Sequence, residues 1–318
     1  LLKELEPEKK QPERKETSIV QTKEDLDHLI SLLSIAPSIC LDTETTSENP
    51  HLAEAVGIGL GLTPEQIWYV PLNGPLPKET VISSLKPLLE KKGLVGHNIK
   101  YDLHILNRLG IKPIPPAFDT MVASYVLRAE ERQHNLDILS LLAFDHLKIP
   151  IDSLIGKGKG AVTMAEVPID QVAAYCAEDI EMTLKLETLF KSQLQERHLQ
   201  KLYDEIELPL IPILTEMEER GIFVDREILA DLNGKVKAKL QELEKAIFEH
   251  AGGMFNLNSP KQLGEILFDK LKIAPPKKTK TGYSTSAEVL ELLSDTHPMI
   301  PLILEYRTLE KLRSTYLE

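Results

Sequence analysis

The segment Ile39-Cys40-Leu41-Asp42-Thr43-Glu44-Thr45-Thr46 decides how this sequence is interpreted. Its apolar residues and the lack of a helical period predict a short buried strand that ends in two acids. Side chains two positions apart on a strand point to the same side, so Asp42 and Glu44 should share one space. A divalent cation such as Mg²⁺ or Mn²⁺ would relieve the repulsion between the two carboxylates. The segment therefore predicts a metal site, with a solvated turn or a helix cap as the alternative.

The composition narrows the class of protein. The chain has 318 residues, enough for about two domains of ordinary size. Its hydrophobic content of 42% supports a packed core, and its net charge of -12 argues against a nucleic-acid footprint over the whole surface but leaves room for local basic patches. The two cysteines, Cys40 and Cys176, lie in apolar surroundings and predict a reducing compartment rather than a disulfide scaffold.

The sequence contains no signal-peptide pattern and no apolar run long enough to cross a membrane. We therefore expect a cytoplasmic protein with no membrane partner. The first residue is leucine, so we also expect a fragment or a processed chain.

The chain divides into regions of different pattern. Residues 1–17 are mainly Glu, Lys and Pro and predict a flexible lead-in. Strand-like and helix-like segments alternate over 18–200, which predicts an α/β domain with a mixed sheet and flanking helices. Residues 201–318 have mostly helical patterns, including a long charged helix over 226–250 that ends at Gly252-Gly253.

Further acids follow at useful spacings. Asn98 and Asp102 come after a predicted strand, are four residues apart and share one face of a predicted helix. Asp102 is thus placed to complete a metal site, although an acid in a first helical turn also complements the helix dipole. Asp119 opens another helix, where we assign it the structural role of an N-cap.

Tyr175 and Asp179 are also four residues apart on a strongly helical run. A phenol one turn from a carboxylate can hold a water while the carboxylate holds a metal; the alternative is a half-buried Tyr175 beside a solvated Asp179. The glycine- and lysine-rich loop over 156–160 lacks the length and the ending of a nucleotide P-loop. Its Lys157 and Lys159 are candidates for contact with a phosphate backbone.

These motifs resemble a known family. Asp42-Thr43-Glu44, Asn98-x-x-x-Asp102 and Tyr175-x-x-x-Asp179, in this order, resemble the three motifs of the DnaQ-like 3′–5′ exonucleases. Phe118-Asp119-Thr120-Met121, the Gly-Lys-Gly-Lys loop and the run from Tyr175 to Asp179 are similar to the proofreading domain of bacterial family A DNA polymerases. The resemblance implies a ribonuclease H-like mixed sheet with flanking helices over 18–200.

The second half resembles the start of the polymerase domain of the same family. The segments that carry this likeness are 203–222, 255–263, 284–290 and 305–316. The resemblance implies an α-helical thumb segment over 201–318, truncated before the palm and fingers, so polymerase activity is not expected. Lys277, Lys278 and Lys280 would then lie along duplex phosphates, with a plain exposed loop as the alternative.

The resemblance also implies a function. The enzyme would hydrolyse the terminal phosphodiester at a single-stranded or frayed DNA 3′ end, releasing a nucleoside 5′-monophosphate, as a proofreading exonuclease in DNA replication and repair. Thr45, Asn98 and Ile151 are expected to line the pocket for the 3′-terminal nucleotides. A bacterial, nucleoid-associated location is expected.

Two divalent ions are implied, Mg²⁺ with Mn²⁺ as a substitute. Asp42, Glu44 and Asp179 are expected to bind the first ion, and Asp42 with Asp102 the second. Such a pair of ions activates the attacking water and stabilises the leaving 3′ oxygen. Tyr175 and Glu44 are expected to orient that water.

Two alternatives stay open. One is an exoribonuclease of the same fold that acts on RNA 3′ ends, which relative rates on DNA and RNA oligonucleotides would distinguish. The other is a catalytically idle DNA-binding or structural module, which the absence of metal binding or of any product would support.

Overall fold

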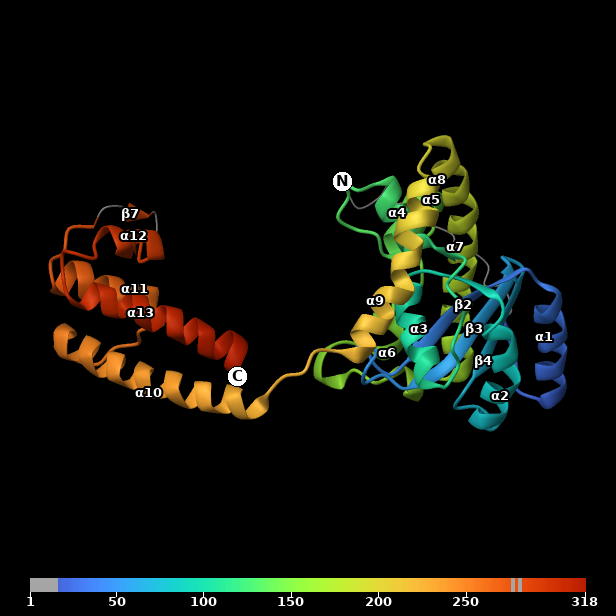
Figure 1. Cartoon of the computed structure of the whole chain (residues 1–318), viewed down its shortest axis with the longest axis horizontal. Helices are drawn as coiled ribbons and strands as arrows, with labels where there is room; N and C mark the ends of the chain where they lie inside the picture. The colour runs from blue at the N-terminus through green and yellow to red at the C-terminus, as the bar shows by residue number, and fades with distance from the viewer. Residues whose placement is uncertain (1–16, 276–277, 280–281) are drawn as a thin grey trace, which may run out of the picture. The chain divides into compact units, whose positions relative to one another are not determined.

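The computed structural model describes residues 17–318 except 276–277 and 280–281 (Figure 1). The predicted lead-in over 1–17 therefore lies almost entirely outside the described residues. Packing divides the chain into two units, Leu1–Gly221 and Ile222–Glu318. Tyr203 and Ile211 are buried in the cores of the first unit, so the chain packs with that unit as far as Gly221. The domain boundary predicted at residue 200 separates an exonuclease domain from a polymerase segment, and it stays a prediction, because packing alone does not define either domain.

The first unit is built on a mixed sheet with the strand order β1-β4-β3-β2-β5-β6. Its strands are β1 (Ser18–Ile19), β2 (Ser38–Thr45), β3 (Ala55–Thr63), β4 (Gln66–Pro71), β5 (Gly93–Gly96) and β6 (Phe118–Asp119). β3 is antiparallel to β2 and β4, and the other neighbouring strands are parallel. The buried strand predicted at 39–44 is thus confirmed as β2, which lies inside the mixed sheet of an α/β unit, as the sequence predicts.

Helices cover both faces of this sheet (Figure 1). Ile39 and Leu41 of β2 pack with α1 (Lys23–Ile35), α2 (Lys78–Leu89) and α3 (Ile99–Arg108). Cys40 points the other way, into a core formed with α4 (Thr120–Leu127), α5 (Leu136–Phe144) and α7 (Ile169–Glu196). Because side chains alternate along a strand, Asp42 and Glu44 follow Cys40 and face α7. The other described elements of this unit are α6 (Asp152–Ile155), η1 (Gly158–Gly160), η2 (Met164–Glu166), α8 (Gln200–Leu202), η3 (Tyr203–Glu207) and α9 (Leu208–Arg220).

Glycines in β3 let α7 approach the sheet closely. A Cβ atom at Gly59 would lie 2.4 Å from Cys176 Sγ, and one at Gly61 would lie 2.4 Å from Ile180 Cγ2. Real Cβ atoms essentially never show such contacts, so only glycine fits while α7 keeps its place. Gly59 pairs with Asp42 in the sheet, so this close approach sets the separation between the acids of β2 and the residues of α7.

Local signals in the sequence explain where several elements begin. The Thr22 side chain accepts a hydrogen bond from the Asp25 amide, which begins α1 with a capping box. The Asp119 carboxylate accepts hydrogen bonds from the amides of Val122, at the start of α4, and of Ile99, at the start of α3. The structural role predicted for Asp119 is therefore confirmed, and this side chain joins two helices that flank the site.

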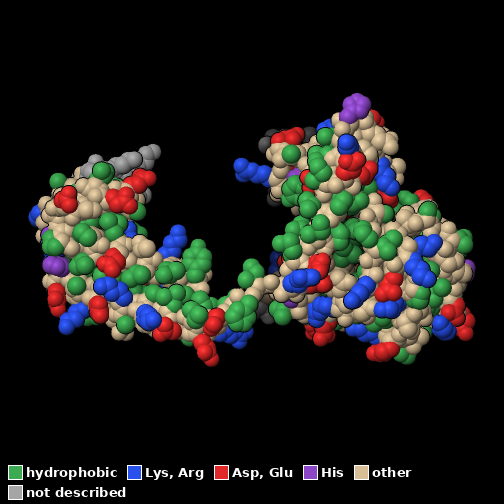
Figure 2. Space-filling view, in the orientation of Figure 1, with side chains coloured by type: hydrophobic (Ala, Val, Ile, Leu, Met, Phe, Trp, Pro, Cys, Tyr) green, Lys and Arg blue, Asp and Glu red, His purple; other side chains and the backbone are tan. Residues whose placement is uncertain are grey.

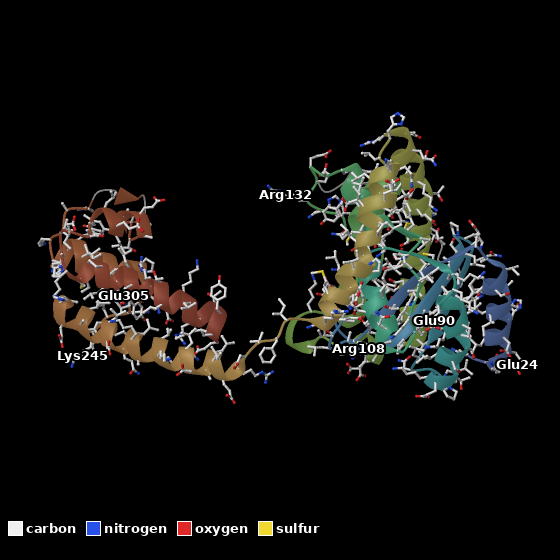
Figure 3. All side chains as sticks on the ribbon, viewed as in Figure 1. Glu24, Glu90, Arg108, Arg132, Lys245 and Glu305 are labelled. Carbon is white, nitrogen blue, oxygen red and sulfur yellow. The ribbon has the colours of Figure 1, made fainter. Side chains whose placement is uncertain are left out.

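The second unit is helical. Its elements are α10 (Arg226–Ala251), α11 (Pro260–Gly264), η4 (Glu265–Lys270), β7 (Lys278–Thr279), β8 (Gly282–Tyr283), α12 (Ala287–Leu292), α13 (Met299–Leu312) and η5 (Arg313–Leu317). The predicted long helix is confirmed as α10, and it ends where Gly252 adopts a left-handed φ of 65°. α10 and α13 pack against each other. Figure 3 labels one residue on each of them, Lys245 on α10 and Glu305 on α13.

The expected basic loop of this unit differs from the structure. Lys278 belongs to β7, which pairs with β8 in a short hairpin, whereas Lys277 and Lys280 lie outside the described residues. A two-residue strand carries no periodic signal, so the sequence could not predict it.

Acidic and basic side chains are interspersed on the face seen in Figure 2. None of the helices described is long and apolar enough to span a membrane.

Candidate active site

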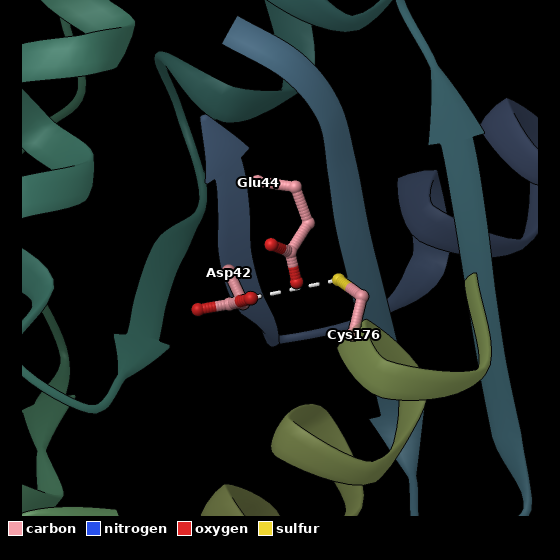
Figure 4. A group of neighbouring side chains, drawn as sticks. All are labelled: Asp42, Glu44 and Cys176. Carbon is pink, nitrogen blue, oxygen red and sulfur yellow. Dashed lines mark hydrogen bonds between the residues drawn. The ribbon is translucent and has the colours of Figure 1, made fainter. Parts of the chain in front are cut away.

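The centre of the site is a group of potential metal ligands from β2 and α7. One ligand atom each from Asp42, Glu44 and Cys176 lies within 4.8 Å of the others (Figure 4). Cys176 Sγ donates a hydrogen bond to Asp42 Oδ2 at 3.5 Å. Glu44 is only 5% exposed, and its Oε1 has no hydrogen-bond partner among the described residues. A buried carboxylate oxygen without a donor needs a cation or a proton, so the two carboxylates of this group, and not the soft thiol of Cys176, fit a hard divalent metal.

Asp179 reaches the same place from α7. Burial raises the pKa of Asp179 to about 7, although Lys148 acts in the opposite direction. Burial also raises the pKa of Glu44 well above its ordinary value, and the charges of Asp42 and Asp179 add to the shift. The carboxylates of both elements thus lie close enough to disfavour one another's ionised form, which a bound cation would reverse.

One cavity, of about 480 Å³, contains most of the predicted site. Four of the five proposed catalytic residues line it: Asp42, Glu44, Tyr175 and Asp179. The three residues expected around the terminal nucleotides line it as well: Thr45, Asn98 and Ile151. Residues more than a hundred positions apart in the sequence therefore meet around one space, although their roles stay proposals.

Asp102 is the predicted acid that the structure places differently. It is 3% exposed and is not among the residues that line the cavity. Its Oδ1 accepts hydrogen bonds from the Thr43 amide at 2.8 Å and from Thr43 Oγ1 at 2.6 Å. Burial raises its pKa well above the ordinary value, and the charge of Asp42 raises it further. Asp102 thus lies near Asp42 but is anchored to the backbone of β2.

The basic loop lies at the edge of the site. Lys157 is 78% exposed and pairs with Asp152 at 2.8 Å, and it does not line the cavity. The side chain of Lys159 is outside the described part of the structure. Lys157 is not brought to the carboxylates of the cavity, so its contact with a longer nucleic-acid strand remains a proposal, as does that of Lys159.

Lys148, a cation of this site, was not predicted from the sequence. Its Nζ lies 2.6 Å from Asp179 Oδ1, and its side chain is only 2% exposed. The contact could not be predicted because a lone lysine after α5 belongs to no motif. The sequence does hold one indication that Lys148 is paired: it lies between the apolar residues Leu147 and Ile149, and a lysine that is buried with such neighbours needs a partner of opposite charge. Tyr101, another lining residue, was also missed; its hydroxyl lies 2.5 Å from Thr45 Oγ1.

Comparisons with known proteins assign two segments of the chain to families. A family model described as 3′–5′ exonuclease matches residues 17–195, and one described as DNA polymerase family A matches residues 226–318. Exonucleases of the first family generally use divalent metal ions.

Curated relatives are similar over nearly the whole chain. DNA polymerase I of Chloroflexus aurantiacus is 39% identical over 99% of this chain and 35% of its own length. DNA polymerase I of Borreliella burgdorferi is 36% identical over 93% of this chain and 33% of its own length. The chain thus spans about a third of the length of these relatives.

A solved structure, the POL domain of Pol1 from M. smegmatis in complex with DNA primer-template and dNTP, has the same fold. The TM-score is 0.76 at 24% sequence identity, and the match covers 94% of this chain and 49% of that one.

Proposed function

Because the chain belongs to the 3′–5′ exonuclease family, we propose that it removes nucleoside 5′-monophosphates from the 3′ ends of DNA. The observation that carries this proposal is the meeting of Asp42 and Glu44 on β2 with Tyr175 and Asp179 on α7 around one cavity. DNA is the proposed substrate because the similar proteins are DNA polymerases and a family A polymerase segment follows the exonuclease segment. Proofreading during replication and repair is the proposed role, in the bacterial cytoplasm where the nucleoid lies.

The carboxylates are proposed to hold two divalent ions, Mg²⁺ with Mn²⁺ as a substitute. When bound, such ions make water more acidic and neutralise the charge that develops on phosphate. Asp42, Glu44 and Asp179 would hold the first. Asp102 would share the second with Asp42, while Thr43 holds the Asp102 carboxylate in place through hydrogen bonds to its Oδ1.

The remaining steps depend on this chain's own side chains. Burial raises the pKa of Tyr175 above its ordinary value, so its phenol stays protonated and can donate a hydrogen bond. Glu44 Oε1, which has no hydrogen-bond partner in the described part of the chain, is an acceptor. Together they would orient a water for in-line attack on the terminal phosphodiester.

Single-stranded or frayed ends are the proposed substrates. Thr45, Asn98 and Ile151 would surround the terminal nucleotides. Lys157 and Lys159 would contact the phosphates of the strand outside the cavity, and Lys277, Lys278 and Lys280 would contact duplex phosphates.

A 5′-labelled single-stranded DNA tests the proposal directly. With Mg²⁺ or Mn²⁺, a ladder of successively shortened products is expected, because removal begins at the 3′ end. EDTA and the variant Asp42→Asn should each abolish the ladder. A 3′-labelled copy should instead release labelled mononucleotide at once.

Two results would contradict the proposal. If an RNA strand of the same sequence is degraded faster than DNA, the exoribonuclease alternative holds. If DNA is bound in a mobility-shift assay and no metal yields product, the chain is an idle binding module.

Replacing Tyr175 with Phe removes only the hydroxyl. We expect kcat to fall by about 100-fold, the usual size for loss of one positioned proton donor or acceptor, with KM for DNA nearly unchanged. Tyr125→Phe is the matched control, since Tyr125 is exposed on α4 and stacks on His134. Single-turnover rates on labelled DNA measure the change, and equal rates for both variants would remove Tyr175 from the mechanism.

A further inference from the structure

Lys148 is a buried cation with two carboxylate partners, one inside the site and one exposed to solvent. Its Nζ lies 2.6 Å from Asp179 Oδ1 inside the site and donates a hydrogen bond to Asp137 Oδ1 at 2.8 Å. It also lies 5.1 Å from the centre of the Tyr175 ring, within the range of a cation–π contact. Asp137 is 65% exposed, whereas Asp179 is 14% exposed. The ammonium therefore stands between the site and the solvent.

The charge of Lys148 is retained in this position. Burial lowers its pKa, but the carboxylates of Asp179 and Asp137 outweigh burial and raise the pKa above the ordinary value for lysine. The ion pair with Lys148 is the contact that the structure shows at Asp179 Oδ1. A positive charge thus already lies against a carboxylate proposed to hold metal.

The segment that carries Lys148 is attached to α7 by a second residue, Glu178. The Glu178 Oε1 atom lies 2.8 Å from His146 Nε2, and its Oε2 accepts a hydrogen bond from the Ile149 amide at 2.6 Å. The backbone on both sides of Lys148 is therefore fixed independently of the ammonium. A change at Lys148 can alter the charge at Asp179 while the segment stays in place.

We propose that Lys148 is a built-in counter-cation that competes with divalent metal for Asp179 and is drawn toward Asp137 when metal binds. An ammonium 2.6 Å from Asp179 Oδ1 and a divalent ion on the same carboxylate would repel each other strongly at low dielectric. Metal binding then requires the ammonium to withdraw, and the exposed Asp137 is the partner that receives it. In this way Lys148 holds Asp179 and Tyr175 in position without metal and lowers the affinity of the site for metal. The inference rests on the proposed function, because it takes Asp179 as a metal ligand.

The test is the affinity of the full chain for Mn²⁺, measured by calorimetry and by electron paramagnetic resonance. The proposal predicts that one variant binds Mn²⁺ more tightly than wild type and another more weakly. Lys148→Met removes the competing charge at similar length, so the dissociation constant for Mn²⁺ should fall about tenfold, as expected for loss of one close like charge. Asp137→Asn removes the receiving carboxylate, so binding should weaken about threefold to tenfold. Lys148→Arg should stay close to wild type because it keeps the charge.

The matched control is Lys185→Met, which breaks an ion pair with Glu181 on α7 but leaves the site intact. Its Mn²⁺ affinity should equal that of wild type. Melting temperatures in EDTA provide a second readout: Lys148→Met should melt lower than wild type without metal, and saturating Mn²⁺ should remove the difference.

Several outcomes would overturn the inference. Unchanged or weaker Mn²⁺ binding by Lys148→Met, or tighter binding by Asp137→Asn, would make Lys148 a purely structural ion pair. If wild type degrades DNA and binds Mn²⁺ while both variants bind like wild type, only this inference fails. If wild type binds no Mn²⁺, the proposed metal site fails with it.

Discussion

Replacing Glu44 with glutamine is expected to lower the exonuclease rate by about three orders of magnitude, a loss typical of removing one group that stabilises transition-state charge. The amide has nearly the same shape as the carboxylate, so the cavity keeps its form. What disappears is the negative charge that would hold a divalent ion and orient water. Glu65→Gln, in the exposed turn between β3 and β4, is the matched control and should keep the wild-type rate.

The same change should stabilise the metal-free protein. Burial and the charges of Asp42 and Asp179 raise the pKa of Glu44 well above the ordinary value of 4.5. The folded state therefore binds this proton more tightly than the unfolded state does, and stability falls as the pH rises above 4.5. Glutamine has no charge to lose, so at pH 8 in EDTA the variant should be more stable by about 1 to 3 kcal/mol, the usual cost of a buried group without its partner.

Denaturant unfolding in EDTA at several pH values measures this gain. The difference between variant and wild type should be largest at pH 8 and should shrink as the pH falls toward 4.5. Saturating Mn²⁺ should reverse it, because only wild type gains fully from the metal. A variant that is inactive and also less stable in EDTA would show that Glu44 is a structural acceptor, and the carboxylate cluster would lose its proposed role.

The sequence predicted this pair of acids because a strand repeats every two residues. Cys40, Asp42 and Glu44 all point toward α7, and the helical spacing of Tyr175 and Asp179 turns both side chains to the same cavity. Periodicity predicts the directions of side chains within one strand or helix, so it can predict only those groups of site residues that belong to the same element. That two such elements face each other followed from the family resemblance and not from periodicity.

The same reasoning could not locate contacts between elements. Asp102 shares a helix face with Asn98, yet its carboxylate accepts hydrogen bonds from Thr43, because a backbone amide of β2 lay within its reach. Lys148 is invisible to any periodic pattern, since its partners come from α5 and α7. Both depend on how helices pack on the sheet, and the spacing of residues within one element does not contain that information.

The close packing of α7 on the sheet does have a signal in the sequence, the alternation Gly57, Gly59, Gly61 in β3. A substitution in this alternation gives the second large expected effect. Gly59→Ala would place a methyl group 2.4 Å from Cys176 Sγ, so Sγ must shift, and in a closely packed core we expect α7 to shift with it. We expect a loss of about 1 to 3 kcal/mol in the free energy of unfolding, the usual cost of overpacking a core. Because Tyr175 and Asp179 move with α7, the exonuclease rate should also fall about 100-fold, as for a misplacement of about 1 Å.

Removing the sulfur should reverse much of this loss. In the double variant Gly59→Ala with Cys176→Ala, the new methyl group occupies space that Sγ leaves, so we expect a coupling of about 1 kcal/mol or more in the stabilising direction. Gly160→Ala is the matched control, since no atom lies within 4 Å of a Cβ there and stability should hardly change. Urea unfolding and single-turnover rates of the four proteins in the cycle measure both effects. Strictly additive losses would mean that Sγ does not limit how close α7 lies to the sheet, and the separation between the acids of β2 and Asp179 would then need another cause.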